Sequence, residues 1–451
     1  MSTPTSLSGF PELLPAQRNA ELAVIDQLRA TFELHGFANI ETRAVEPLDV
    51  LLRKGEIDKE VYVLRRLQSD DDTSDSGVGL HYDLTVPFAR YVLDNAGRLE
   101  FPFRRYQIQR VWRGERPQEG RFREFTQADI DIIAKDELPF HFDVEAARVL
   151  AEALAALPLP HLSLQINNRK LIEGFYRGIG AHDPGAAMRV IDKLDKLPPE
   201  KVGAMLVADA GMSAHQAEQC LALATIRRSD TSFVERVHAL GVGHELLDVG
   251  LGELAAVLDG CAAAANERFS VEADLRIARG LDYYTGTVFE INMSGYESLG
   301  AVGAGGRYDA LATDGRTTYP GVGISFGISR TLVPLLQRGL LSSSRSVPSA
   351  VLVALVDEAS RPASDAIAQQ LRARGIPTEV AVSPQKYGRQ IRYADRRGIP
   401  FVWFPGDDEP DQVKDIRSGE QIAADARSWA PPIEDLRPQV INTVSSEGQS
   451  T

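Results

Sequence analysis

Apolar side chains recur every three or four positions over residues 15–35. This spacing places them on one face of a helix, and the Gly36 that follows is a common helix stop. Residues 37–45 then have the composition of a strand that leads to Pro47. We therefore predict a long helix followed by a strand at the start of the chain.

A second pattern predicts a hairpin over residues 104–133. We interpret the run from Ile108 to Arg113 as a strand with one face in water, because its polar and apolar side chains fit a period of two. Residues 114–120 form the expected loop, and the returning strand is expected over 122–132. The hairpin carries seven arginines, at positions 104, 105, 110, 113, 116, 121 and 123. We expect its two strands to carry arginines to one surface.

The arginine cluster indicates an anionic ligand. Neighbouring guanidinium groups repel one another unless an anion lies among them, and their planar fork binds phosphate oxygens in pairs. The carboxylates of Glu124, Asp129 and Asp131 follow within a few residues and could hold a cationic or hydrogen-bonding substrate. For any single arginine, an ordinary salt-bridged strand pair is the simpler interpretation. For the cluster, we predict a polyphosphate site.

Residues 79–91 predict a second group of binding side chains. If Leu80 to Thr85 is a strand, Asp83 and Thr85 point to the same face, and Pro87 starts a helix after them. A carboxylate beside a hydroxyl could hold an ammonium group. Alternatively, the two side chains cap that helix.

We interpret residues 1–338 as one domain that is interrupted by an insertion. Residues 183–268 are rich in alanine and lack a strand pattern, so we interpret them as a helical insertion. Glycine or alanine fills five of the six positions over 301–306, so a ligand or another backbone must approach closely there. Arg330 falls in the first turn of an expected helix, which is the positive end of a helix. A cation at that end indicates a bound anion.

Beyond a linker at residues 339–347, strands and helices alternate. This order predicts a small α/β domain over 348–430 with a mostly parallel sheet, followed by a flexible tail at 431–451. The helix expected over 386–397 is basic, with Lys386, Arg389, Arg392, Arg396 and Arg397 against Asp395. Because this domain as a whole is near neutral, RNA binding there would depend on that helix, and the affinity should fall steeply with salt.

Composition narrows the class of protein. A chain of 451 residues with 43% hydrophobic content can fill several cores, and its net charge of -14 argues against a general nucleic-acid coat protein. Cys220 and Cys261 have no partner at the spacing of a metal site, so we expect neither a disulfide nor zinc. No segment has the length of a membrane span and the N-terminus lacks the pattern of a signal peptide, so we expect a cytoplasmic protein. The sequence also contains no Gly-Lys dipeptide, which the Walker phosphate loop requires.

Several motifs together resemble one known family. They are HYDLTVPFARY at 81–91 with its preceding residues, the arginine hairpin, NNRKL at 167–171, RGLDYYTGTVFE at 279–290, GGRYD at 305–309 and GISFGISR at 323–330. In these segments the chain resembles histidyl-tRNA synthetases, which are class II aminoacyl-tRNA synthetases, in the version with Asp rather than Glu at position 83. The likeness covers roughly residues 10–430, and the run at 279–290 is its most specific part.

The resemblance implies a fold and a reaction. The catalytic domain would be α+β, a six-stranded antiparallel sheet flanked by helices, with the helical insertion and a C-terminal α/β anticodon-binding domain. Its substrates would be L-histidine, ATP and tRNA(His), with Mg²⁺ on the ATP phosphates. A homodimer would form through the helix, the strand and Pro47 near the N-terminus.

The resemblance also implies roles for individual residues. Arg113 and Arg279 would be catalytic at the α-phosphate of ATP. ATP would contact Arg113, Arg121, Phe125, Arg279 and Arg330. The amino group of histidine would bind Asp83, Thr85 and Gln127, and its imidazole would bind Asp131 and Tyr284 beside Tyr283.

Two other interpretations share part of these motifs. The first is the histidine-sensing, synthetase-like regulatory subunit of ATP phosphoribosyltransferase, which usually lacks the C-terminal domain and alters the phosphate arginines. The second is a class II synthetase for proline, threonine or glycine, which shares the hairpin and the α/β domain but not RGLDYYTG. The complete set of arginines and the RGLDYYTG run favour histidine activation.

Overall fold

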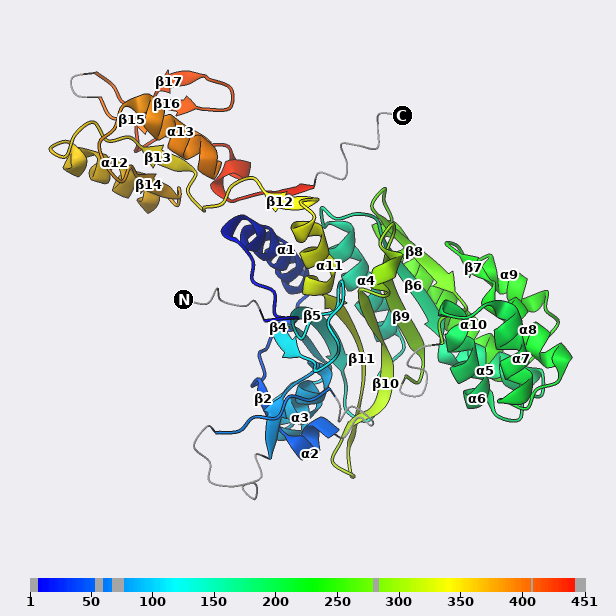
Figure 1. Ribbon diagram of the computed structural model, residues 1–451. Helices are drawn as coiled ribbons and strands as arrows, with labels where there is room; N and C mark the ends of the chain where they lie inside the picture. Colours follow the sequence, from blue (N-terminus) through cyan, green and yellow to red (C-terminus); the bar gives the residue numbers. More distant parts are fainter. Residues whose placement is uncertain (1–6, 53–59, 67–76, 279–283, 407–408, 443–451) are drawn as a thin grey trace, which may run out of the picture. The chain divides into compact units, whose positions relative to one another are not determined.

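The computed structural model describes residues 7–52, 60–66, 77–278, 284–406 and 409–442 (Figure 1). The chain divides into two compact units. The first contains residues 1–11 and 27–334, and the second contains 12–26 and 335–451. Helix α1 (Pro15–Leu34), which confirms the predicted N-terminal helix, contributes residues to both.

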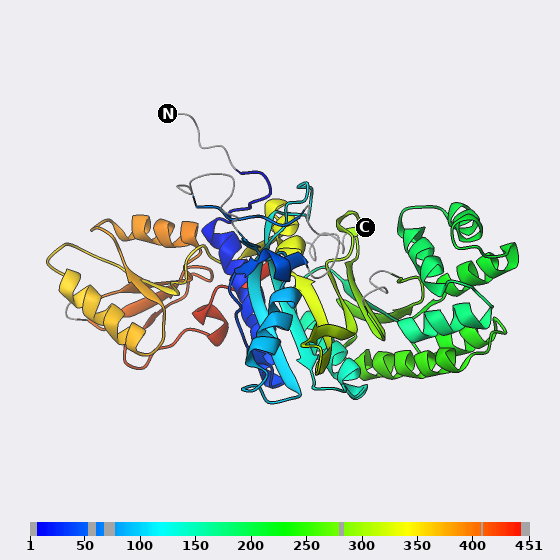
Figure 2. The same ribbon diagram turned by 90° about the horizontal axis from the view of Figure 1, so that it is seen from below.

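A mixed sheet forms the centre of the first unit (Figures 1 and 2). Nine strands lie in the order β1-β4-β5-β11-β10-β9-β6-β8-β7 among the described residues. Their bounds are β1 (Ala38–Asn39), β4 (Phe103–Trp112), β5 (Glu124–Ile133), β11 (Thr318–Gly327), β10 (Gly303–Thr313), β9 (Thr287–Met293), β6 (Leu162–Asn168), β8 (Phe269–Asp274) and β7 (Arg227–Arg228).

Six consecutive strands of this order pair with one another antiparallel, namely β4, β5, β11, β10, β9 and β6. They correspond to the sheet that the family resemblance implies, and the predicted α+β class is confirmed. The sheet is wider than expected because β1 adds parallel to β4, β8 adds parallel to β6, and β7 pairs with β8. The predicted hairpin is also present as β4 and β5, with the loop between residues 112 and 124.

The segment before β4 differs from the prediction. Strand β3 (Val78–Leu80) is short, and Thr85 is already the first residue of helix α3 (Thr85–Asn95). The strand predicted from Leu80 to Thr85 is therefore wrong. The helix predicted to start at Pro87 instead begins at Thr85, so Pro87 lies in the first turn of α3, where a proline is tolerated. Strand β3 pairs with β2 (Val45–Pro47), which is followed by helix α2 (Leu48–Leu51).

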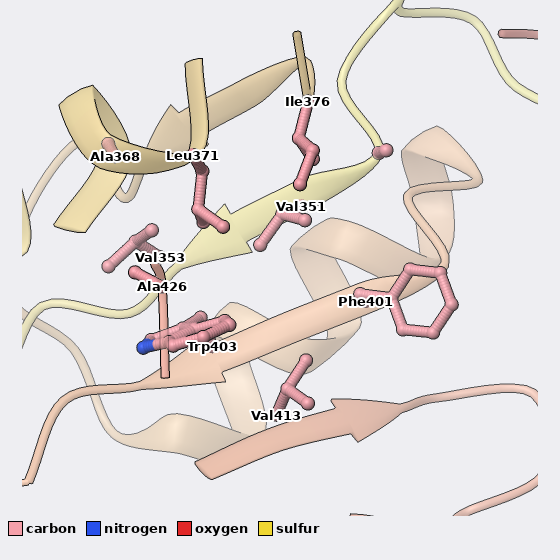
Figure 3. Packing of buried hydrophobic residues seen from close by; sticks show 10 residues of the cluster. Val351, Val353, Ala368, Leu371, Ile376, Phe401, Trp403, Val413 and Ala426 are labelled. Atoms are coloured by element: carbon pink, nitrogen blue, oxygen red, sulfur yellow. The ribbon is translucent and has the colours of Figure 1, made fainter. Parts of the chain in front are cut away.

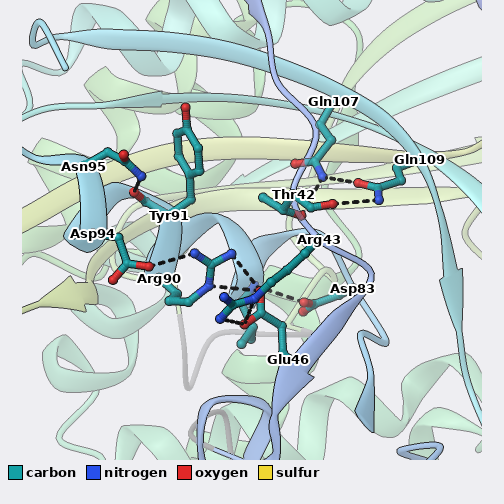
Figure 4. Close-up of polar contacts among 11 residues, drawn as sticks. Thr42, Arg43, Glu46, Asp83, Arg90, Tyr91, Asp94, Asn95, Gln107 and Gln109 are labelled. Atoms are coloured by element: carbon teal, nitrogen blue, oxygen red, sulfur yellow. Dashed lines mark hydrogen bonds and ion pairs between the residues drawn. The ribbon is translucent and has the colours of Figure 1, made fainter. Parts of the chain in front are cut away.

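Helix α3 is fixed on the sheet by apolar packing on one side and a buried charge pair on the other. Its Phe88 and Val92 pack into a cluster with Ile133 of β5. The carboxylate of Glu46 in β2 is fully buried and lies 2.7 Å from Nη2 of Arg90 in α3. Figure 4 shows this pair together with the contact between Arg43 and Glu46. The start of α3, where Asp83 and Thr85 lie, is thereby held in place.

Helices form the part of the first unit between β6 and β8 (Figure 1). They are α5 (Arg169–Gly178), α6 (Pro184–Ile191), η2 (Asp192–Asp195), α7 (Pro199–Ala208), α8 (Ala214–Ala224), α9 (Phe233–His238), α10 (Glu245–Cys261) and η3 (Ala262–Ala264). A side chain on Gly250 of α10 would meet the backbone of Leu171 at 2.2 Å, so α5 and α10 pack closely because a glycine separates them. The short strand β7 is the exception to the helical pattern predicted for 183–268.

Three further elements complete this part of the chain. Helix α4 (His141–Ala155) follows β5, and η4 (Glu297–Leu299) lies between β9 and β10. Helix α11 (Ile328–Gln337) follows β11 directly and holds Arg330 in its first turn, as predicted. No helix in the described part of the chain is both long enough and apolar enough to cross a bilayer.

The second unit contains a five-stranded sheet in the order β14-β13-β15-β16-β17. The bounds are β13 (Val351–Val353), α12 (Arg361–Ala373), β14 (Thr378–Val380), α13 (Tyr387–Arg397), β15 (Phe401–Phe404), β16 (Gln412–Asp415) and β17 (Gln421–Ala423). The pairs β13–β14 and β13–β15 are parallel, whereas β15–β16 and β16–β17 are antiparallel. The sheet is thus mixed rather than mostly parallel.

Both faces of this sheet are covered, which explains its continuous apolar strands. Along β15, Phe401 and Trp403 join a cluster with Leu371 of α12, as Figure 3 shows. The intervening Val402 joins a second cluster with Ala394 of α13. Alternate side chains of one strand therefore fill two cores.

Strands also occur in two segments that were expected to lack regular structure. In the expected linker at 339–347, β12 (Leu341–Ser343) pairs with β18 (Val440–Asn442) from the expected tail at 431–451. The 3-10 helix η5 (Ile433–Leu436) lies in the same tail. Two three-residue strands far apart in the sequence stabilise each other only after folding, so neither is recognisable locally.

Candidate active site

A cavity of about 250 Å³ opens on the antiparallel sheet of the first unit. Strands β5, β10 and β11, the loop between β4 and β5, and the start of α11 contribute to its wall. Nine predicted site residues line it, namely Asp83, Thr85, Arg113, Arg121, Phe125, Gln127, Asp131, Tyr284 and Arg330. The other two, Arg279 and Tyr283, lie outside the described residues.

Strand β5 forms one wall because its side chains alternate between the two faces of the sheet. Phe125, Gln127, Asp129 and Asp131 line the cavity. The intervening Ala128, Ile130 and Ile132 are completely buried on the other face. A single strand thus carries an aromatic ring, an amide and two carboxylates along one side of the cavity.

A buried ion pair lies at the Asp131 end of this wall. The Nη2 atom of Arg105 in β4 is 2.5 Å from Oδ2 of Asp131, and both side chains are buried. The hydroxyl of Tyr308 in β10 donates a hydrogen bond of 2.8 Å to Oδ1 of Asp131. The guanidinium of Arg105 also lies over the ring of Phe88, 4.2 Å from its centroid. These contacts fix the orientation of the Asp131 carboxylate.

The arginines of the hairpin do not gather on one surface, so that expectation is wrong. Arg104 pairs with Glu145 of α4 and the exposed Arg110 pairs with Glu124, whereas Arg105 is buried beside Asp131. Residues separated by an odd number of positions face opposite sides of a strand, and carboxylates are available on both sides. Two of the seven, Arg113 and Arg121, line the cavity among the residues that the structure describes.

The cations of the cavity are held by neutral or partly exposed partners. The Nε–H of Arg113 donates to the backbone oxygen of Tyr82 at 3.0 Å, and its guanidinium lies 5.1 Å from the ring centroid of Phe125. Arg121 is half exposed and lies 3.5 Å from a carboxylate oxygen of Glu115. The guanidinium of Arg330 donates to the backbone oxygen of Leu299. An anion entering here would meet several guanidinium groups.

Asp83 makes the contact of a helix cap, and both Asp83 and Thr85 lie where the binding interpretation places them. Oδ1 of Asp83 accepts a hydrogen bond of 3.0 Å from the backbone N–H of Val86, in the first turn of α3. Both Asp83 and Thr85 nevertheless line the cavity. A side chain that fixes the start of the helix therefore also presents its carboxyl group to a ligand.

Burial changes the proton affinity of two groups in the wall. It raises the pKa of Asp129 to about 7, although the charge of Arg105 opposes the rise and that of Asp131 adds to it. Burial, with the charges of Asp131 and Asp129, also raises the pKa of the Tyr284 phenol well above its usual value. Tyr284 consequently keeps its proton at neutral pH and can donate a hydrogen bond.

The small residues over 301–306 bring strands and side chains close together, as predicted. A side chain on Gly305 would meet the backbone oxygen of Gly323 at 2.2 Å. One on Gly306 would meet the ring of Tyr284 at 2.6 Å, and one on Gly323 would meet Oδ1 of Asp131 at 1.9 Å. These glycines leave the space that Asp131 and Tyr284 occupy.

Three polar lining residues received no role from the sequence: Glu115, Tyr308 and Ser325. Asp129 was named from the sequence only as one of three carboxylates that could hold a substrate, and it shares the face of Gln127 and Asp131 because it lies two residues from each on the same strand. Tyr308 stands in the GGRYD motif but has no spacing that relates it to Asp131. Ser325 could be placed only through the pairing of β11 with β5.

Comparison with known proteins agrees with this geometry. The profile described as "Histidyl-tRNA synthetase" matches residues 9–331, and that described as "Anticodon binding domain" matches 350–428. The curated histidine–tRNA ligase of Micrococcus luteus is 57% identical, with 98% of this chain and 99% of that protein covered. The histidine–tRNA ligase of Cutibacterium acnes is also 57% identical, over 97% of this chain and 98% of that protein.

The chain belongs to the histidyl-tRNA synthetase family. A crystal structure of histidyl-tRNA synthetase from Nostoc sp. PCC 7120 is similar in three dimensions, with a TM-score of 0.83 and 33% identity over 94% of this chain and 98% of that one. The prediction of a histidyl-tRNA synthetase, rather than a regulatory subunit or a synthetase for another amino acid, is confirmed.

The second unit of this family member has a basic cavity of its own. Its volume is about 290 Å³, and Arg389, Arg392, Tyr393 and Arg396 of α13 contribute to its lining. Arg389, Arg392 and Arg396 are exposed, whereas Arg397 pairs with Glu379 at 2.8 Å. Three guanidinium groups of the predicted basic helix are therefore available to an anionic partner.

Proposed function

We propose that this chain activates L-histidine with ATP and transfers it to the 3′ end of tRNA(His). The carboxylate oxygen of histidine attacks the α-phosphorus of ATP, the bond to the bridging oxygen breaks, and diphosphate leaves. A hydroxyl of the terminal ribose of the tRNA then attacks the carbonyl of histidyl-adenylate, and AMP leaves. The observation that carries this proposal is the shared cavity of three guanidinium groups and the carboxylate of Asp131.

The arginines suit the first step because it joins two anions. Negative charge spreads over the oxygens of the α-phosphate in the transition state, and cations fixed in advance stabilise that charge most. We assign Arg113 to the α-phosphate, with Arg121 and Arg330 on the outer phosphates and Phe125 against the adenine. The contact of the Arg113 guanidinium with Tyr82 supports this assignment, because a held cation needs no reorganisation during the reaction. The role of Arg279 opposite Arg113 rests on the family motif alone.

The amino-acid pocket suits histidine because it pairs polar groups with both ends of the substrate. Asp83, Thr85 and Gln127 bind the ammonium group, while Asp131 and Tyr284 bind the imidazole with Tyr283 beside them. A carboxylate accepts one ring N–H, and a phenol that keeps its proton donates to the other ring nitrogen. An amino acid that lacks these ring nitrogens would leave buried polar groups without partners, and such a site discriminates strongly.

Mg²⁺ would enter as part of the ATP substrate, carried by its phosphates. Within the described ranges, no group of three or more His, Cys, Asp or Glu side chains is arranged to hold a metal. The phosphate oxygens are hard ligands of the kind that Mg²⁺ prefers. The work of this chain's own residues is to orient the phosphates and to balance their charge.

The proposal extends to assembly and RNA binding. The basic cavity of α13 supports a contact with the anticodon arm of the tRNA, because its arginines face solvent. We further propose a homodimer formed through α1 and the strand before Pro47, and a cytoplasmic location, which suits the two free cysteines. Light scattering at several protein concentrations would test the dimer.

Isotope exchange between ATP and diphosphate tests the reaction directly. The full-length chain is incubated with ATP, labelled diphosphate and each of the twenty amino acids in turn. Exchange should require histidine and should exceed the rate with any other amino acid by at least about two powers of ten, as for sites that pair with a polar side chain. Exchange that depends on a different amino acid, or none with histidine, would refute the proposal.

A further inference from the structure

Three polar side chains form a chain of hydrogen bonds across two strands of the cavity wall. The amide Nε2 of Gln127 donates to Oγ of Ser325 at 2.8 Å. The hydroxyl of Ser325 donates to Oδ1 of Asp129 at 2.5 Å. Ser325 lies directly opposite Asp129 in the pairing of β11 with β5. The chain Gln127–Ser325–Asp129 is thus built from antiparallel strands rather than from mobile loops.

The direction of these hydrogen bonds follows from the carboxylate. In its ionised form the Asp129 carboxyl group only accepts hydrogen bonds, so the proton of the Ser325 hydroxyl then points to Asp129. The Ser325 oxygen can then only accept, and only the NH₂ end of an amide can donate to it. Gln127 is therefore held with its carbonyl oxygen turned away from Ser325. An uncharged group at 129 would allow either direction.

The carbonyl oxygen of Gln127 is the end of the chain that faces a ligand. This Oε1 atom is buried and has no hydrogen-bond partner within the described part of the protein. A buried acceptor without a partner is unfavourable, and such an atom in a folded protein calls for an explanation. Gln127 lines the cavity, so a bound cation with N–H groups would supply the partner.

We propose that Asp129 and Ser325 are positioning residues, which orient the Gln127 amide so that its oxygen accepts from the α-ammonium group of the substrate. The inference rests on the proposed function, in which Gln127 binds that amino group. Neither residue needs to touch the substrate. A bound ammonium would in turn favour the ionised form of Asp129, because a nearby cation stabilises a carboxylate.

Ser325 has a second interpretation, which its surroundings do not support. It is the serine of Gly323–Gly327, which has the Gly-x-Ser-x-Gly spacing of a hydrolase nucleophile elbow. That motif needs a sharp turn between a strand and a helix, whereas Ser325 lies inside strand β11. Its hydroxyl donates to Asp129 rather than to a histidine, and no histidine is among the described lining residues of the cavity.

The test compares histidine with 3-(imidazol-4-yl)propionate, which has the same ring and carboxylate but no amino group. Diphosphate exchange by full-length Ser325→Ala and Asp129→Asn enzymes gives KM for histidine and for ATP, and competition gives Ki for the analogue. We expect KM for histidine to rise about tenfold, equivalent to losing one hydrogen bond to a charged group. KM for ATP and Ki for the analogue should each change by less than about twofold.

A Ser325→Thr variant keeps the hydroxyl and is the matched control. It should stay within about threefold of the wild-type KM for histidine, and a loss equal to that of Ser325→Ala would overturn the inference by pointing to packing. Parallel weakening of histidine and the analogue would also overturn it, since Asp129 would then serve the imidazole. An unchanged KM for histidine in Ser325→Ala would overturn this inference but would leave the proposed function intact. Wild-type enzyme without histidine-dependent exchange would instead refute the underlying function.

Discussion

Arg105 and Asp131 form an ion pair of 2.5 Å beneath the cavity, with neither side chain exposed to solvent to any significant extent. The pair couples the stability of the sheet to the shape of the amino-acid pocket. Removing one member of a buried pair leaves the other charge uncompensated, which costs about 3–5 kcal/mol. The carboxylate that we assign to the imidazole would also lose its fixed orientation.

Replacing Arg105 by methionine should therefore affect both stability and substrate binding. We expect a lower urea midpoint and a rise in KM for histidine that exceeds any rise in KM for ATP. Arg110→Ala is the matched control on the same strand, because Arg110 is exposed and such surface pairs contribute at most about 1 kcal/mol. Equal effects of the two substitutions would contradict the structural role of the buried pair.

Gly323 provides a test of the space around Asp131. A methyl group on Gly323 would meet Oδ1 of Asp131 at 1.9 Å, so Gly323→Ala must displace the carboxylate or the strand. Overpacking of this kind costs about 1–3 kcal/mol, and we expect the KM for histidine to rise roughly tenfold in diphosphate exchange. Gly252→Ala in α10 is the control, since no atom lies within 4 Å of its new methyl group. If both variants kept the wild-type KM, the pocket would not depend on this glycine.

The basic helix α13 should govern tRNA binding without affecting amino-acid activation. The double substitution Arg389→Ala and Arg392→Ala removes two exposed cations from the cavity of the second unit. KM for tRNA(His) should rise. The plot of log affinity against log salt concentration should become shallower by about 1.4, or about 0.7 for each phosphate that is no longer neutralised. Arg427→Ala is the control, because Arg427 is exposed but pairs with Asp425. Loss of diphosphate exchange in the double variant would contradict this division of work.

The two cysteines should be chemically inert in the folded protein. Burial raises the pKa of Cys220 to about 12 and that of Cys261 to about 12. The reactive thiolate is thus scarce at pH 8. It forms only when the pH approaches this raised pKa or when the protein unfolds. Mass spectrometry after treatment with iodoacetamide should find no modification of native protein and two modified cysteines in urea. Rapid labelling of the native protein would show that one of these thiols is accessible.

The hairpin illustrates which features can be predicted from sequence. Strand spacing and loop composition are local, so β5 and the end of β4 were predictable within a residue or two, although β4 begins at Phe103, five residues before the predicted strand. Which arginine reaches the cavity depends on acids supplied by other elements, such as Glu145 for Arg104. The surface predicted for seven arginines therefore became several separate ion pairs, and two arginines of the hairpin line the cavity within the described ranges.

The site itself shows the same limit. Motif residues such as Asp131 and Arg330 could be named because their neighbours in the sequence identify them. Asp129 was visible from the period of its strand, but its link to Gln127 runs through Ser325, 196 positions from Asp129. Long-range pairing of strands creates such contacts, and a single sequence does not reveal it. The pairing of β12 with β18 was missed for the same reason.

The most direct test of the central claim is histidine-dependent diphosphate exchange by Arg113→Ala, measured beside wild type and Arg110→Ala. Arg113 lines the cavity and is assigned to the α-phosphate, whereas Arg110 lies on the same hairpin and is exposed. The account predicts a loss of roughly two to three powers of ten in kcat for Arg113→Ala, as for removal of one transition-state donor, with little change for Arg110→Ala. Wild-type exchange by Arg113→Ala would contradict the claim that this cavity activates histidine.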